Sequence, residues 1–141
     1  MKATELMIND WVLYEREPYQ TRELGINGVN RDGEDYPAVC IGKPTDIGLI
    51  VERKKIKPIP LTHEILEKNG WVYNNDDEKF FPQTWVGGGL MLQGTDDCGY
   101  RIVVTSDYDD EDTNNTPFIL LFVHELQHAL RLRRIKKEIK L

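Results

Sequence analysis

The sequence has few cysteines and no long hydrophobic segment. Cys40 and Cys98 are its only two cysteines, and they lie far apart outside any CxxC motif. Small secreted domains usually carry a denser set of cysteines, so we expect two reduced thiols in a cytoplasmic protein. No apolar stretch approaches the roughly 18 residues of a membrane-spanning helix, and the amino terminus lacks the pattern of a secretory signal. We therefore expect a protein with no membrane partner.

Basic residues are not in excess either. The chain has 18 Lys and Arg against 24 Asp and Glu, a formal net charge of −6. Nucleic acid would have to bind a local basic patch against a repulsive overall field. Nucleic acid is therefore disfavoured as a partner. Weak binding through the amino-terminal β region and the basic tail, residues 131–141, remains an alternative function.

Short strand-like segments separated by turn residues predict an α+β fold. In residues 1–60 they indicate a small bent β-sheet or a partly open barrel. The stretch NGVNRDGEDYP, residues 27–37, is typical of a loop. The expected strands of this amino-terminal β subdomain lie near Trp11–Tyr14, Tyr19–Ile26, Ala38–Ile41 and Gly48–Val51.

The sequence of residues 61–141 predicts a short linking helix, a β-meander and a carboxy-terminal helix. In an alternative interpretation, both parts of the chain form one compact domain. Thr62 is a suitable N-cap and Gly70 a suitable C-cap for the first helix, whose His63 is expected to be exposed. Segments between residues 71 and 106 predict the antiparallel meander. A strand from residue 118 and a helix over residues 123–134 would follow, and this helix would cover the meander.

The stretch FVHELQHAL, residues 122–130, resembles the HExxH motif of zinc hydrolases. On a helix His124 and His128 project from one face, and Glu125 would polarise a zinc-bound water. A catalytic zinc also needs a third protein ligand. Residues 131 and 134 are arginine, so the extended HExxHxxGxxH pattern is absent, and Glu138 would lie roughly 15 Å away along the same helix.

An upstream third ligand stays open as an alternative, from His63 or from Asp107, Asp109 or Asp110. The neighbouring arginines disfavour a dication, so we expect no catalytic, cofactor-binding or metal-binding residues; His124, Glu125 and His128 form a site only in the alternative hypothesis of a zinc hydrolase. DYDDEDTNNTPF lacks the glycine and final glutamate of a calcium loop. VGGGL lacks the lysine of a phosphate loop and indicates a bulge or a close strand contact.

PIPLTHEILEKNGW, FVHELQHAL and the opening ELMINDWVLY carry a resemblance to a known family. In these patches the chain resembles an uncharacterised family of small proteins that recurs in Bacteroidetes genomes and their mobile elements. The family usually reads Val-His-any-Leu-Gln-Asn here, with asparagine in place of His128. The resemblance implies that a metal is not general to the family. It carries no activity that could be transferred to this chain.

With no complete catalytic set, the sequence favours a non-catalytic accessory or interaction module that binds a protein partner and needs no cofactor. The zinc-dependent hydrolase is the alternative from a different class.

Overall fold

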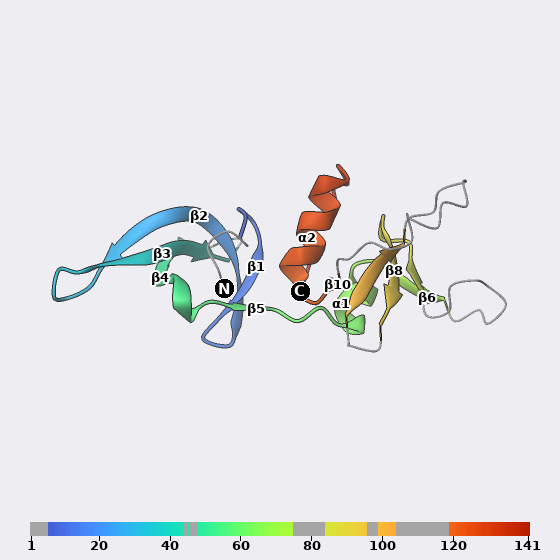
Figure 1. The fold of residues 1–141 in the computed structure, drawn as a ribbon, viewed down its shortest axis with the longest axis horizontal. Helices are drawn as coiled ribbons and strands as arrows, with labels where there is room; N and C mark the ends of the chain where they lie inside the picture. The colour runs from blue at the N-terminus through green and yellow to red at the C-terminus, as the bar shows by residue number, and fades with distance from the viewer. Residues whose placement is uncertain (1–5, 44, 46–47, 75–83, 96–98, 104–118) are drawn as a thin grey trace. The chain divides into compact units, whose positions relative to one another are not determined.

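The computed structural model describes residues 6–43, 45, 48–74, 84–95, 99–103 and 119–141. The chain divides into two compact units, Met1–Ile59 and Pro60–Leu141. In these described residues each unit contains one five-stranded antiparallel sheet, and both α-helices belong to the second unit (Figure 1). The predicted α+β fold is confirmed. None of the described helices is long and apolar enough to span a membrane.

The sheet of the first unit is open. Its strand order is β4-β3-β2-β1-β5, and each neighbouring pair is antiparallel. Strands β4 and β5 form the two edges and do not pair with each other, so the sheet is not closed into a barrel. Its elements are β1 (Trp11–Tyr14), β2 (Glu17–Val29), β3 (Asp35–Gly42), β4 (Leu49–Glu52), the 3-10 turn η2 (Arg53–Lys55) and β5 (Lys57–Pro58).

Strand β2 is strongly bent. Its pairing with β3 shifts in register between Thr21 and Glu23, and again between Glu23 and Ile26. Gly25 lies inside the second shift with a φ of 72°. Such β-bulges bend a strand and increase its twist. Figure 1 shows β2 as a long arch beside β3, which confirms the bent sheet expected from the sequence.

The prediction of a loop over residues 27–37 is wrong. Strand β2 continues to Val29 and β3 begins at Asp35, so most of this stretch forms a hairpin. The reason is a cross-strand contact between Gly28 and Tyr36, which are direct partners. A Cβ atom on Gly28 would lie 2.1 Å from the Tyr36 ring, so the ring fills the space that a side chain would take.

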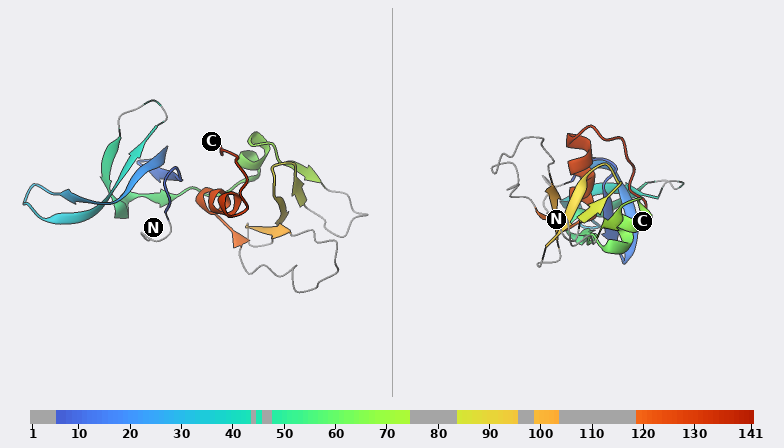
Figure 2. Two further views of the ribbon diagram at one scale, coloured as in Figure 1. Left: turned by 90° about the horizontal axis from the view of Figure 1, so that it is seen from above. Right: turned by 90° about the vertical axis from the view of Figure 1, so that its right-hand side faces the viewer.

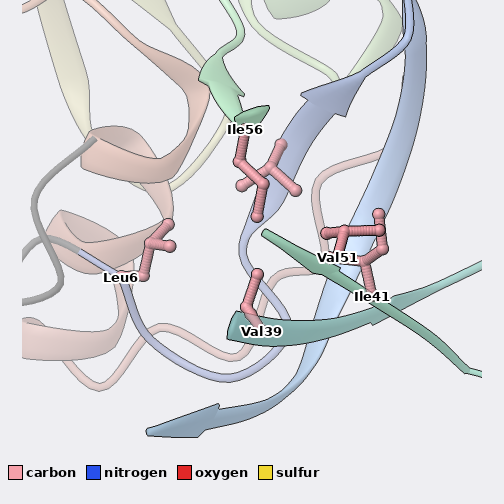
Figure 3. Close-up of a cluster of buried hydrophobic side chains, with 6 residues drawn as sticks. Leu6, Val39, Ile41, Val51 and Ile56 are labelled. Atoms are coloured by element: carbon pink, nitrogen blue, oxygen red, sulfur yellow. The ribbon is translucent and has the colours of Figure 1, made fainter. Parts of the chain in front are cut away.

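One face of this sheet closes on an apolar core (Figure 3). Val39 and Ile41 alternate along β3, and Val12 of β1 is fully buried beside them. Removal of this apolar surface from water is the main favourable term in folding the unit. The whole cluster comprises Leu6, Val12, Val39, Ile41, Val51 and Ile56.

A two-residue turn joins β1 to β2. Glu15 and Arg16 have φ values of 49° and 70°, which is the backbone of a type I′ hairpin turn. Near the turn, Lys43 Nζ lies 2.9 Å from Glu17 Oε2 and 5.2 Å from the centre of the Tyr19 ring. The hydrogen bond and the charge of Lys43 hold the pKa of Glu17 below its ordinary value.

The second unit is an antiparallel meander with two α-helices. The strand order β10-β9-β8-β7-β6 follows the chain in reverse and confirms the predicted meander. The expected strand segment EKFFP lies outside the described residues. The elements are α1 (His63–Lys68), β6 (Val72–Asn74), β7 (Thr84–Val86), β8 (Met91–Gly94), β9 (Tyr100–Val103), β10 (Ile119–Leu120) and α2 (Val123–Leu132).

Both predicted caps of α1 are confirmed. The Thr62 hydroxyl accepts a hydrogen bond from the Ile65 N–H at 3.3 Å. At the other end Gly70 has a φ of 92°, and the Trp71 N–H donates to the Leu66 carbonyl at 3.0 Å. This is the Schellman motif, in which a left-handed residue satisfies the last carbonyls of the helix.

Helix α2 ends two residues earlier than the sequence predicted, at Leu132 rather than Arg134. Arg134 has a φ of 57°, and the Ile135 N–H donates to the Leu130 carbonyl at 2.9 Å. The helix therefore closes with a second Schellman motif in which arginine occupies the left-handed position. Arginine gives no sequence signal for such an end, because glycine is the usual residue there.

The last residues return to α1. The Asn69 side-chain amide donates to the Lys140 carbonyl at 2.7 Å, and the Lys140 N–H donates to Asn69 Oδ1 at 2.7 Å. Ile139 is buried, and Lys137 Nζ lies 5.3 Å from the centre of the Trp71 ring. The left view of Figure 2 shows the carboxyl terminus beside α1. The tail is therefore a packed segment rather than an extension of α2.

Arg134→Gly is expected to stabilise the protein by about 1 kcal/mol, because it removes the strain of a left-handed residue that has a Cβ atom. Urea unfolding followed by circular dichroism measures the change. Arg133→Gly is the matched control, because Arg133 has a φ of −86° and should gain nothing. Equal effects of the two substitutions would contradict the assignment of this helix end.

Candidate functional site

The two histidines of the HExxH-like stretch lie side by side on α2. The ring centres of His124 and His128 are 5.6 Å apart, and His124 is buried and stacked on Phe122. Glu125 Oε2 accepts a hydrogen bond from the Leu121 N–H at 3.1 Å. Its carboxylate therefore satisfies a backbone donor at the start of the helix, where the helix dipole favours negative charge.

No third ligand joins these histidines in the described part of the chain. Among those residues no group of three or more His, Cys, Asp or Glu could hold a metal ion, so His63 does not converge with His124 and His128. The zinc hypothesis thus retains its two imidazoles, and a loop aspartate as third ligand stays a prediction. The candidate ligands Asp107, Asp109 and Asp110 lie outside the described residues.

His63 takes part in a different cluster, within the second unit. The residue is exposed, as predicted, yet its imidazole has two ring contacts that the sequence did not indicate. Its Nδ1 is hydrogen-bonded to the Tyr100 hydroxyl at 2.5 Å. It also stacks on Trp85, with ring centres 4.9 Å apart and an angle of 20° between the planes. The two contacts fix the orientation of the imidazole.

The register of the meander brings the aromatic residues of this cluster to one face of the sheet. Tyr73 of β6 lies opposite Trp85 of β7, and Trp85 lies opposite Leu92 of β8. Two residues further along β8, Gly94 lies opposite Tyr100 of β9. Directly opposed residues point to the same side of a sheet, and so do alternate residues of one strand. The three aromatic side chains therefore share the face on which His63 packs.

An open pocket of about 420 Å³ lies on this face, lined by His63, Glu67, Tyr73, Trp85 and Gly94. Trp85 is only 3% exposed and contacts Tyr73 at 5.0 Å between ring centres, so it forms a fixed apolar wall. The Tyr73 side chain is 42% exposed and presents its ring to solvent. Glu67, one helical turn after His63, adds a carboxylate.

The glycine-rich turn VGGGL supports the hairpin that carries Trp85. Gly87 and Gly89 have φ values of 98° and 101°, which glycine adopts without strain. Gly88 is required for a different reason, since a Cβ atom there would lie 2.0 Å from the Trp71 ring. The Trp71 indole N–H donates to the Leu90 carbonyl at 2.8 Å. The sequence predicted a bulge or a close strand contact here, whereas the structure shows a bend between β7 and β8 whose close contact is with the Trp71 side chain.

No motif in the sequence indicated a role for Tyr73, Trp85, Tyr100 or Glu67. One local signal was present, the spacing of His63 and Glu67 by one helical turn. The aromatic residues carry no such signal, because they meet only through the register of strands β6 to β9.

No protein-family model matches the chain, and no curated protein or solved structure matches it. We therefore infer the chemistry of the pocket from the residues that line it. The described residues that line it supply a carboxylate, an imidazole, a phenol and an indole. Aromatic faces beside a carboxylate are suited to binding a ligand.

Proposed function

We propose that this protein is a cytoplasmic, non-catalytic interaction module that binds a partner protein through the aromatic pocket of its second unit. The pocket lined by Tyr73, Trp85 and His63 is the observation that carries the proposal. Exposed aromatic rings beside a buried, rigid one are typical of the residues that dominate protein interfaces.

The pocket is also preorganised. Trp85 contacts His63 at 4.9 Å and Tyr73 at 5.0 Å between ring centres, and the hydrogen bond between His63 and Tyr100 holds His63 in place. Because these side chains are already ordered, a ligand would lose little additional conformational entropy on binding. Pockets of this size, within the usual range of about 300 to 1,000 Å³, accommodate a side chain or a small molecule.

A non-catalytic role has support at both histidine sites. The Glu125 carboxylate, which the zinc-hydrolase alternative assigns as general base, accepts a hydrogen bond from the Leu121 N–H. His63 is hydrogen-bonded to Tyr100 at Nδ1 and stacks on Trp85, and these contacts hold the imidazole as part of the pocket wall. A cytoplasmic location agrees with the low cysteine content and with Cys40 as a free thiol.

Site-specific photo-crosslinking tests the proposal. A benzoylphenylalanine residue in place of Tyr73 is expected to form a discrete adduct in the native host. Val29, 63% exposed in the first unit, is the control position and should not form that adduct. Excess unlabelled wild-type protein should suppress the adduct, and unlabelled Tyr73→Ala should not.

The proposal fails if the Tyr73 position gives no adduct, or if Tyr73→Ala competes as well as the wild type. Elemental analysis of protein purified without chelator tests the rival zinc hydrolase and is expected to find no stoichiometric zinc. One zinc per chain that disappears in His128→Asn would instead establish a metal centre at His124 and His128.

A further inference from the structure

We infer that the pocket takes the cationic side chain of an arginine or lysine from a basic segment of the partner protein. The inference rests on the proposed binding function and names the chemistry of the ligand. Three independent features carry it: the aromatic faces, the Glu67 carboxylate and the distribution of charge along the second unit.

The aromatic walls suit a cation. The face of an aromatic ring carries partial negative charge and attracts an ammonium or guanidinium group within about 6 Å of its centre. Tyr73 is 42% exposed, so its ring is accessible to a ligand, while the buried Trp85 supports it from behind at 5.0 Å. A planar guanidinium can also stack on such a ring, which an anion would not do.

Glu67 supplies the opposite charge. It is exposed at the pocket, on the same side of α1 as His63, and no basic side chain of the described residues forms an ion pair with it. An apolar occupant would remove water from this carboxylate without replacing its hydrogen bonds, which is unfavourable. A basic side chain would satisfy it, because an ammonium or guanidinium donates charge-assisted hydrogen bonds.

The charge of the surrounding sequence has the same sign as Glu67. Residues 61–118 contain twelve Asp and Glu against three Lys and Arg, a formal charge of −9. Residues 119–141, which form β10, α2 and the tail, carry two acidic and six basic residues, a formal charge of +4. The helix and strands that line the pocket belong to the acidic part of the sequence, and this composition favours a cationic ligand over an anionic one.

NMR titration of the isotope-labelled full chain tests the inference. The probe is the peptide acetyl-Gly-Gly-Arg-Gly-Gly-amide, and the control is the same peptide with neutral citrulline in place of arginine. The Trp85 indole signal should shift in a saturable manner with the arginine peptide and at least about fivefold more weakly with the citrulline peptide. The indole signal of Trp71, whose N–H is bonded to Leu90, should stay unchanged. Raising the salt concentration should weaken the binding.

Two matched pairs of variants locate the interaction. Tyr73→Leu removes the aromatic ring and is expected to weaken binding about three- to fivefold, whereas Tyr73→Phe keeps the ring and the affinity. Glu67→Gln is expected to weaken binding by a similar factor. Glu64→Gln, on the same helix but outside the pocket lining, changes the net charge equally and should have no effect.

Equal binding of the arginine and citrulline peptides would overturn the inference and leave the interaction module in place. The same holds if Tyr73 crosslinks to a partner in the host but neither peptide shifts Trp85. Equal effects of Glu64→Gln and Glu67→Gln would reduce the result to nonspecific charge attraction and also overturn it. Tighter binding of spermidine than of the arginine peptide would show that the occupant is a free amine rather than a protein segment.

Discussion

Gly88→Ala is expected to destabilise the second unit by about 3 kcal/mol or more. The new Cβ atom would lie 2.0 Å from Cδ2 and Cε2 of Trp71, far inside van der Waals contact. The indole cannot move aside without loss, because it is 1% exposed and its N–H donates to the Leu90 carbonyl at 2.8 Å. Forced overpacking of this kind typically costs about 1–3 kcal/mol, and displacement of a buried tryptophan adds to it.

Urea unfolding followed by circular dichroism and tryptophan fluorescence measures this effect. Gly33→Ala in the first unit is the control, since its Cβ atom would meet nothing within 4 Å although its φ is 79°. That substitution should cost only about 1 kcal/mol, through backbone strain alone. Similar losses in the two variants would show that the contact between Gly88 and Trp71 is not close.

A double variant tests the contact between Gly88 and Trp71 directly. Trp71→Phe removes part of the indole and is destabilising by itself. Combined with Gly88→Ala it should cost less than the sum of the two single substitutions, because the smaller ring leaves room for the methyl group. Additive effects would contradict direct contact between the two residues.

Thr21→Val is expected to destabilise the first unit by about 2–3 kcal/mol. The fully buried Thr21 hydroxyl donates to the Met7 carbonyl and accepts the Asp10 N–H at 2.9 Å. Valine has nearly the same shape but cannot form either hydrogen bond. The Asp10 N–H would lose the shorter of these two contacts, while its contact of 3.3 Å to the Met7 carbonyl would remain. Each buried backbone group that loses its partner costs about 1–3 kcal/mol.

Thr21→Ser is the matched variant, because it keeps the hydroxyl and removes only a methyl group. Its expected cost is about 1 kcal/mol, from the loss of buried apolar surface. Thermal or urea unfolding of the two variants measures the difference in their stability. If serine destabilises as much as valine, the hydroxyl contributes nothing beyond packing.

The helix ends show which structural features local sequence can predict. Thr62 and Gly70 are cap residues by their own chemistry, and the structure places them at the two ends of α1. Arg134 has no such chemistry, so the end of α2 was predicted two residues too late. The return of the chain from that point to Asn69 is held by two hydrogen bonds between Asn69 and Lys140. Residues 71 positions apart leave no local pattern that would reveal such a contact.

The candidate site also has features that the sequence predicts and features that it does not. The spacing of His124 and His128 by itself determined that their rings would lie side by side, because four residues are about one helical turn. The binding of Glu125 to the Leu121 N–H was not predicted. That hydrogen bond reaches back to Leu121, outside the helix, and depends on the path of the chain before Val123.

The sequence by itself determined the α+β class, the bent sheet, the meander and the caps of α1, since these follow from periodicity and from residues close together in the chain. Only the tertiary structure decided that His63, Tyr73 and Trp85 line one pocket with Glu67. The physical reason is strand register: a shift of one residue would turn Tyr73 or Trp85 to the opposite face of the sheet. That register is a property of paired strands, not of any single segment.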